Sequence, residues 1–206
     1  MRKYLSFVLL GILSLVGLGA AVLGIAQSQS GTSLGQAVTN TLKSPNYSEY
    51  LVEKTPQGSQ TANLVFEAPD RLGGSLESAG RRTYLVIIGS TEYISVTRPA
   101  GSTSAPLTFY TQQTTGAQAV DPAHTYLPYY DRGPSTRSGS VTTVTLSQGG
   151  QTEKLTYTVT GNYVSKFTAV TPGGTISLEI SKVGTSPAVS LPKGAKIVAS
   201  PGRSAG

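Results

Sequence analysis

Along most of the chain, apolar and β-branched residues alternate with polar ones, and turns rich in Gly, Pro and Ser separate the runs. A period of two predicts β-strands that turn one face toward a core. No long helix intervenes between successive runs, which favours an antiparallel meander. About nine strands are too many for a flat sheet, so we expect a barrel or half-barrel. The predicted strands are residues 47–54, 60–67, 73–77, 83–88, 92–97, 141–146, 154–159, 163–171 and 175–181, with 106–112 as a further candidate.

The run from Arg82 to Arg98 predicts a hairpin with Gly89-Ser90 as its two-residue loop. That loop sets the pairs Ile88–Thr91, Val86–Tyr93 and Leu85–Ile94. One face then carries Leu85, Ile87, Ile94 and Val96, and the other carries Tyr84, Val86, Ile88 and Tyr93. A strand pair with one face in water alternates apolar and polar residues, but this hairpin is apolar on both sides. Both faces therefore need a cover, one a packed core and the other helices or a bound apolar molecule.

Two helices are predicted after the N-terminal segment. Ser33 followed by Gln36 is a capping-box pattern, and an apolar stripe then indicates an amphipathic helix over residues 33–43. Asp121-Pro122 is the second helix start, with an N-cap Asp and Pro at the first helical position. Pro128 interrupts this insert helix, which is rich in aromatic residues.

The first 26 residues are typical of an export signal or an anchor. Arg2 and Lys3 precede an uncharged run from Leu5 to Ile25, which has the length of a membrane-spanning helix. Small residues near Ala26 favour cleavage, and an uncleaved anchor is the alternative. Either way, the basic residues predict that the rest of the chain lies outside the cytoplasmic membrane. The expected organisation is a signal peptide or anchor (1–26), a linker (27–32), one domain (33–198) and a disordered tail (199–206), with disorder expected from Pro187 onward.

Composition excludes several kinds of chemistry. The chain has no cysteine, which removes disulfides, thiolate metal sites and a lipidated cysteine. Its single histidine, His124, rules out a site with several His ligands, and we expect it to be exposed on the first helical turn. The acidic residues, Glu49 and Glu53 among them, alternate with apolar ones and are expected on a solvated face. No phosphate-binding loop or dinucleotide fingerprint is present, and the net charge of +6 is not clustered, so we expect no cofactor, no metal and no nucleic acid.

Several strings in order resemble the LolA-like lipoprotein-carrier superfamily, and most of all its exported LppX/LprG/LprA branch. They are FEAPDR (66–71), VIIGSTEYI (86–94), DPAHTYL (121–127), GNYVSKF and LPKGAKIV. The resemblance implies a curved antiparallel sheet that wraps helices, with an apolar cavity between them that holds acyl chains. Members of that branch carry an acylated lipobox cysteine, which this chain lacks. It is therefore expected to be released or held by an uncleaved N-terminal helix.

Together these features predict a mainly β (α+β) fold, an antiparallel half-barrel of about nine to eleven strands wrapping an N-terminal helix and a short insert helix. The predicted function is an exported, non-enzymatic carrier or binder of a lipid or other hydrophobic ligand. Its expected partners are that ligand, the cell-envelope membrane and an unidentified membrane protein. The alternatives are an envelope sensor or interaction protein with a self-filled core, and a Ser/His hydrolase. The residues expected to line the ligand site are Leu85, Ile87, Ile94, Val96, Tyr126, Leu127, Tyr130, Phe167, Ile176, Leu178 and Ile180.

Overall fold

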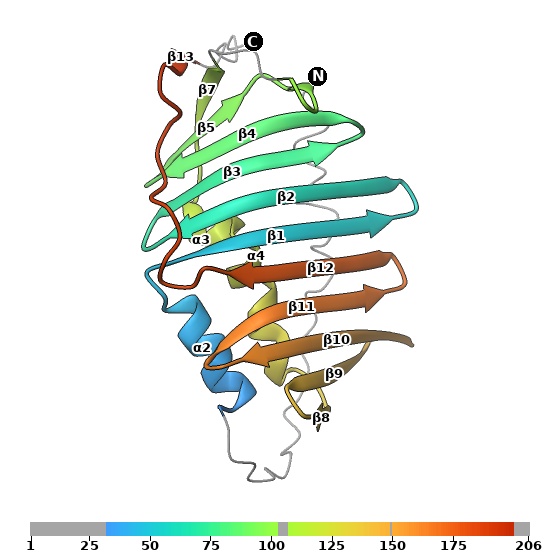
Figure 1. The fold of residues 1–206 in the computed structure, drawn as a ribbon. Helices are drawn as coiled ribbons and strands as arrows, with labels where there is room; N and C mark the ends of the chain where they lie inside the picture. Colours follow the sequence, from blue (N-terminus) through green and yellow to red (C-terminus); the bar gives the residue numbers. More distant parts are fainter. Residues whose placement is uncertain (1–31, 103–106, 149, 200–206) are drawn as a thin grey trace.

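The structure is a computed structural model that describes residues 32–102, 107–148 and 150–199 (Figure 1). Its main feature is one large, curved and unclosed sheet of thirteen strands. The strands of the first half are β1 (Asn46–Thr55), β2 (Gly58–Glu67), β3 (Arg71–Ser78), β4 (Arg81–Ile88), β5 (Thr91–Ser95), β6 (Arg98–Pro99) and β7 (Thr108–Gln113). Those of the second half are β8 (Ser135–Ser138), β9 (Val141–Gln148), β10 (Gln151–Thr160), β11 (Tyr163–Thr171), β12 (Gly174–Ser181) and β13 (Lys196–Ala199).

The sheet joins two meanders through its central strand. β1 pairs with β2 on one side and with β12 on the other, giving the order β13-β7-β5-β4-β3-β2-β1-β12-β11-β10-β9-β8, with β6 paired to β4. All pairs are antiparallel except β13 with β7. The mainly β, curved architecture predicted from the sequence is confirmed, with more strands than expected. The additional strands β6, β8 and β13 have two to four residues, too few for an alternating pattern to reveal.

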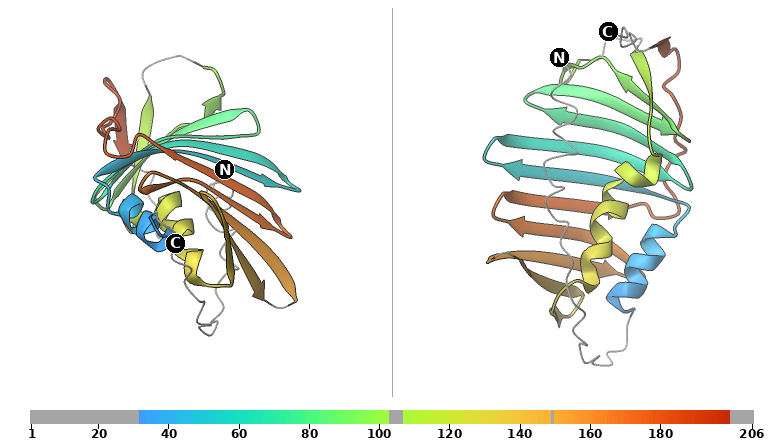
Figure 2. Two further views of the ribbon diagram at one scale, coloured as in Figure 1. Left: turned by 60° about the horizontal axis from the view of Figure 1, so that its bottom comes forward. Right: turned by 180° about the vertical axis from the view of Figure 1, so that it is seen from behind.

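The helices lie against the concave face of the sheet (Figure 2). They are α2 (Leu34–Leu42), followed much later by α3 (Ala117–Val120), α4 (Pro122–Tyr126) and the 3₁₀ helix η1 (Leu127–Asp131). We refer to residues 117–131 as the insert, because they lie between β7 and β8. Both predicted caps are present: the Ser33 hydroxyl accepts the Gln36 N–H, and the Asp121 carboxylate accepts the His124 N–H.

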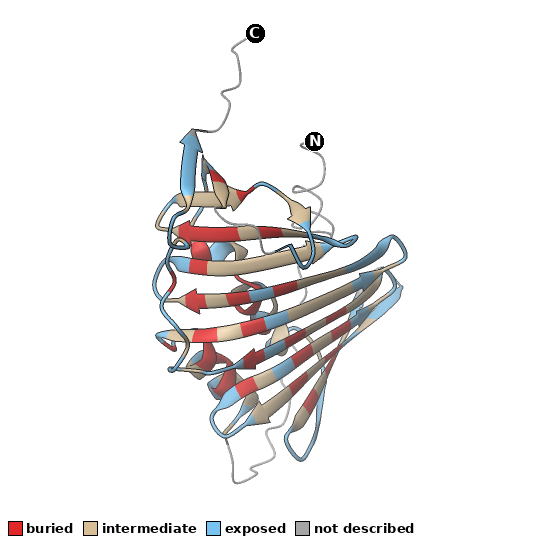
Figure 3. Cartoon of the chain, turned by 45° about the horizontal axis from the view of Figure 1, so that its top comes forward, coloured by how far each residue is buried: buried red, intermediate tan, exposed pale blue. Residues whose placement is uncertain are grey.

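Both faces of the β4–β5 hairpin are covered, by different parts of the chain. The predicted pairs Leu85–Ile94, Val86–Tyr93 and Ile88–Thr91 are confirmed. Leu85 and Ile87 belong to the large core between the concave face and the helices. On the convex face, Val86 packs with Phe109 and Val189 in a second, smaller core. Buried positions accordingly alternate with more exposed ones along the strands (Figure 3).

The convex cover is the C-terminal segment, residues 182–199, which runs along one side of the sheet (Figure 1). Val189 is 4% exposed; its N–H donates to Glu67 Oε2 at 2.8 Å, and its carbonyl accepts from Arg71. The expectation of disorder from Pro187 onward is therefore wrong for residues 187–199. Pro and Gly predicted flexibility there, but the buried valine and its hydrogen bonds fix the segment.

The predicted signal peptide or anchor lies outside the described residues, as do most of the predicted linker and residues 200–206 of the predicted tail. Among the described helices, none is long and apolar enough to cross a membrane.

Candidate functional site

The insert is fixed to the sheet at the first turn of α4. Asp121 precedes the helix as its N-cap and is fully buried, and Pro122 follows at the first helical position. The carboxylate oxygen Asp121 Oδ2 accepts three hydrogen bonds. They come from the Tyr47 hydroxyl at 2.7 Å, the His124 backbone N–H at 3.0 Å and His124 Nδ1 at 2.8 Å. A helix start is thereby bound to strand β1.

The His124 ring lies between the insert and the sheet. Its centroid is 4.8 Å from that of Phe66, and its side chain is only 17% exposed. Nδ1 lies 3.0 Å from the Tyr47 hydroxyl as well as beside Asp121, and among the described residues no serine hydroxyl hydrogen-bonds to the ring. The expectation of an exposed histidine is wrong, because helix α4 packs its first turn directly on β1 and β2.

Glu49 is the second carboxyl group at this point. It lies on β1, is 3% exposed, and its Oε1 accepts the Ala123 N–H at 2.9 Å. Burial, and then the charge of Asp121, raise the pKa of Glu49 well above its ordinary value. Burial, Asp121 and Glu49 also raise the pKa of the Tyr47 hydroxyl. We call Tyr47, Glu49, Asp121 and His124 the Glu49–Asp121 cluster.

Sequence reasoning missed this cluster by placing Glu49 on a solvated face. The available signal was strand parity. Glu49 alternates in step with Tyr47, which is buried, so both side chains point to the concave face. Whether a helix covers that part of the face depends on the insert, whose contact residue Ala123 lies 74 residues after Glu49, and no local pattern indicates such a contact.

The structure brings ten of the eleven predicted ligand-lining residues into the concave-face core. Seven are buried within it: Leu85, Ile87, Leu127, Phe167, Ile176, Leu178 and Ile180. Three are partly buried against it: Ile94, Tyr126 and Tyr130. Val96 differs, because it follows the end of β5, is 43% exposed and belongs to neither core cluster of the described residues. That these residues line a ligand site remains a prediction.

The insert extends the same core with aromatic rings. Tyr126 stacks on Phe167 with ring centroids 5.8 Å apart, and Tyr157 contacts Phe167 edge-on. Tyr130 packs so closely on Gly35 of α2 that a Cβ there would lie 3.1 Å from the ring. The insert and α2 thus form one layer over the concave face (Figure 2).

Not all of the apolar side chains at the concave-face core are buried. A set of apolar side chains packs against it while staying partly exposed, and from this set we take Leu51, Leu76, Ile94, Tyr126, Tyr129 and Leu146 as the open strip. Leu51 and Leu76 flank the buried Ala62 in register across β1, β2 and β3. The open strip is therefore a continuation of the core.

Polar atoms with no protein partner also occur on this side of the sheet. The Tyr157 hydroxyl and Glu153 Oε2 are inaccessible to solvent and find no hydrogen-bond partner among the described residues. Burial raises the pKa of Glu53 and Glu153, which favours their neutral forms. Within the described ranges, no group of three or more His, Cys, Asp or Glu side chains could hold a metal ion.

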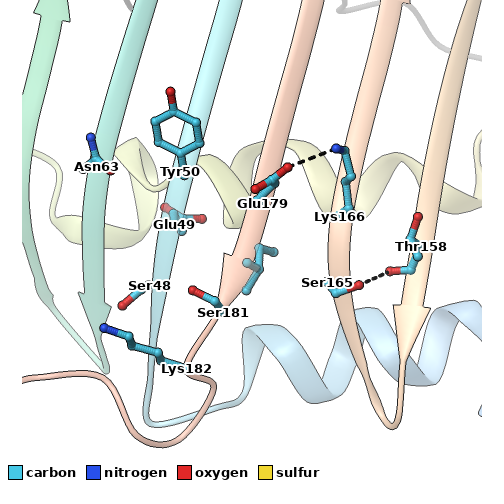
Figure 4. Close-up of a pocket in the computed structure, with 11 residues that line it drawn as sticks. Ser48, Glu49, Tyr50, Asn63, Thr158, Ser165, Lys166, Glu179, Ser181 and Lys182 are labelled. Carbon is cyan, nitrogen blue, oxygen red and sulfur yellow. Dashed lines mark hydrogen bonds and ion pairs between the residues drawn. The ribbon is translucent and has the colours of Figure 1, made fainter.

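An open hollow of about 460 Å³ lies on the opposite, convex face (Figure 4). Several of its polar side chains already have partners: Lys166 pairs with Glu179 at 3.0 Å within the hollow, and Ser165 and Ser48 hydrogen-bond at 2.8 Å to Thr160 and Ser186 beside it. Of the predicted site residues, Ile180 alone borders it. This is the pattern of a satisfied polar surface.

Comparisons with known proteins give similarity in fold. No protein-family model matches the chain, and no curated protein does. The chain is similar to the solved structure of LprF from Mycobacterium bovis, with 12% identity, 78% of this chain and 95% of that chain covered, and a TM-score of 0.44. It is also similar to the lipoprotein LppX from Mycobacterium tuberculosis, with 12% identity, coverage of 76% and 96%, and a TM-score of 0.45.

Proposed function

We propose that this chain is an exported, non-enzymatic protein that binds a hydrophobic ligand, a lipid or lipid-modified molecule, over the open strip of its concave face. The observation that carries the proposal is that the apolar side chains of this strip pack against the concave-face core and yet stay partly exposed. An apolar chain laid on it would gain about 25 cal/mol for each Å² of apolar surface removed from water.

Polar features of the same face are compatible with a ligand that has a polar end. The unpartnered Tyr157 hydroxyl and Glu153 Oε2 offer hydrogen bonds that the described protein groups leave unused. Buried polar groups are normally satisfied by protein, water or ligand. Export is supported by the N-terminal pattern, Arg2-Lys3 followed by a long uncharged run.

The test uses a fluorescent acyl probe and two tryptophan variants. Leu76→Trp fills space on the open strip and should weaken probe binding at least about tenfold, which corresponds to about 1.4 kcal/mol. The matched control is Val170→Trp on β11, where the native valine is 49% exposed, outside the core, and the change should leave binding unaltered. Thermal melts report the folding of both variants.

Equal probe binding by wild type, Leu76→Trp and Val170→Trp would overturn the assignment of the open strip as the ligand site. Native mass spectrometry of protein purified from its own host identifies the natural ligand. If that protein carries no ligand and the pure protein takes up no acyl probe, the proposal is overturned. The alternative is then a sensor or interaction protein whose core is filled by its own side chains.

A further inference from the structure

We propose that Glu49 is protonated and donates a hydrogen bond to Asp121, and that this hydrogen bond is a latch. The latch holds the insert on the concave face, and it opens as pH rises. The inference adds regulation to the hydrophobic-ligand site and rests on that proposed function for its biological meaning. The latch itself is a property of the ligand-free protein.

The evidence for a shared proton is the hydrogen bonding of the two carboxyl groups. Glu49 Oε1 accepts the Ala123 N–H, and Asp121 Oδ2 accepts from Tyr47 and His124. The other two oxygens, Glu49 Oε2 and Asp121 Oδ1, are buried, and neither meets a donor group among the described residues. The Glu49 and Asp121 side chains are close enough to hydrogen-bond to each other, and two carboxyl groups can form such a bond only when one of them is protonated. A proton on Glu49 Oε2 satisfies both oxygens at once.

The surroundings supply little positive charge to stabilise two carboxylates. The elements packed around Glu49 are β1, β2, β12 and α4, and the titratable side chains they turn toward it are Tyr47, Asp121 and His124. The strand neighbours of Glu49 in register are Leu64 and Ile180, both apolar. In the described ranges, no Lys or Arg forms an ion pair with either carboxyl group, and the basic side chain next to the pair is His124, whose Nδ1 lies 2.8 Å from Asp121 Oδ2. Loss of the proton therefore leaves two like charges in a buried place, which is strongly unfavourable.

The two carboxyl groups lie at the contact between the insert and the sheet, so loss of the proton weakens that contact. The hydrogen bonds from Ala123 to Glu49 and from Tyr47 to Asp121 both join the first turn of α4 to β1. Repulsion between the carboxylates would push that turn away from the strand. The insert then lifts, and Ala123 and Leu127, both buried under it, become exposed together with the concave face. The minor open state grows with pH, and an apolar ligand that binds the open state would enter through it.

The test compares wild type with Glu49→Gln. The Gln amide reproduces the protonated carboxyl, since its oxygen accepts from Ala123 and its N–H donates to Asp121, but it cannot ionise. Hydrogen exchange of residues 120–127, corrected for its intrinsic dependence on pH, reports opening without any ligand. In wild type the opening equilibrium should rise by up to about tenfold per pH unit over part of the range from about pH 5 to pH 9. In Glu49→Gln it should be flat.

The matched control is Glu53→Gln, four residues along the same strand and face, where burial also raises the carboxyl pKa but α4 makes no hydrogen bond. It should keep the wild-type pH dependence. A flat wild-type profile, or a steep profile in Glu49→Gln, would overturn the latch. If Glu49→Gln does not fold, carbon NMR of the wild-type carboxyl groups decides: a neutral Glu49 at about pH 6 supports the latch, and an ionised Glu49 overturns it.

The acyl probe separates the two proposals. Uptake that is the same at every pH, with flat exchange, leaves the ligand site standing and overturns the latch. Steep exchange without any probe uptake leaves the latch standing and overturns the proposed function.

Discussion

Val189 of the C-terminal segment packs directly on Gly73 of β3: a Cβ placed on this glycine would lie 2.9 Å from Val189 Cγ1. Gly73 has no positive φ among the backbone angles, so its role is space. The absence of a side chain lets a buried valine reach the convex face of the sheet. The segment held there continues into β13, which pairs with β7 and forms the edge of the sheet.

Gly73→Ala should destabilise the protein by about 1–3 kcal/mol, because the new methyl group overpacks the site. In the Val189→Ala background the same change should cost much less, since the Val189 Cβ itself would lie 3.8 Å from the new Cβ, an ordinary contact. Urea unfolding of the four proteins gives the coupling energy. Additive effects of the two substitutions would contradict the packing described.

His124→Ala should cost about 1–3 kcal/mol in unfolding free energy, because it removes a buried hydrogen bond to Asp121 and the ring contact with Phe66. The neighbouring exposed Thr125 provides the control, and Thr125→Ala should stay within about 0.5 kcal/mol of wild type. Equal stability of the two variants would show that the histidine is a surface residue after all.

The unfolding free energy of wild type should fall relative to Glu49→Gln as pH rises. Glu49 has a raised pKa in the folded protein and an ordinary value of 4.5 when unfolded, so between these values the folded state holds more protons. The stability that the Glu49 proton contributes is fully present below about pH 4.5. As pH rises from there to the pKa of Glu49 in the folded protein, this contribution is lost by up to about 1.4 kcal/mol per pH unit. Chemical denaturation between about pH 4 and pH 8 measures the difference. A difference that does not change with pH would contradict the assignment.

Thr41→Val should destabilise the docking of α2. The Thr41 hydroxyl is fully buried, accepts the Val164 N–H at 3.0 Å and donates to the Ala37 carbonyl at 2.8 Å. Valine keeps the shape but leaves the strand N–H unpaired in the core, at a cost of about 1–3 kcal/mol. Thr41→Ser keeps the hydroxyl and should cost less. Thermal melts of both variants measure these costs. If Thr41→Ser costs as much as Thr41→Val, the hydrogen bond does not contribute to stability.

The sequence by itself determined the features that depend on neighbouring residues. The Gly89-Ser90 loop set the register of the β4–β5 hairpin, since a two-residue turn leaves only one pairing. Ser33 and Asp121 marked their helix starts, because the capping side chain bonds to an N–H three residues later. Apolar alternation likewise predicted the long strands and the curved, mainly β fold.

Only the tertiary structure decided what covers each face. Glu49 is buried because an insert far along the chain places the Ala123 N–H and Asp121 against it, and His124 is enclosed by the same contact. Val189 is buried because Gly73 leaves room for it, although its own surroundings in the sequence predict a flexible tail. Local patterns fix which side of a strand a residue faces, but burial depends on the partner that long-range packing brings to that side.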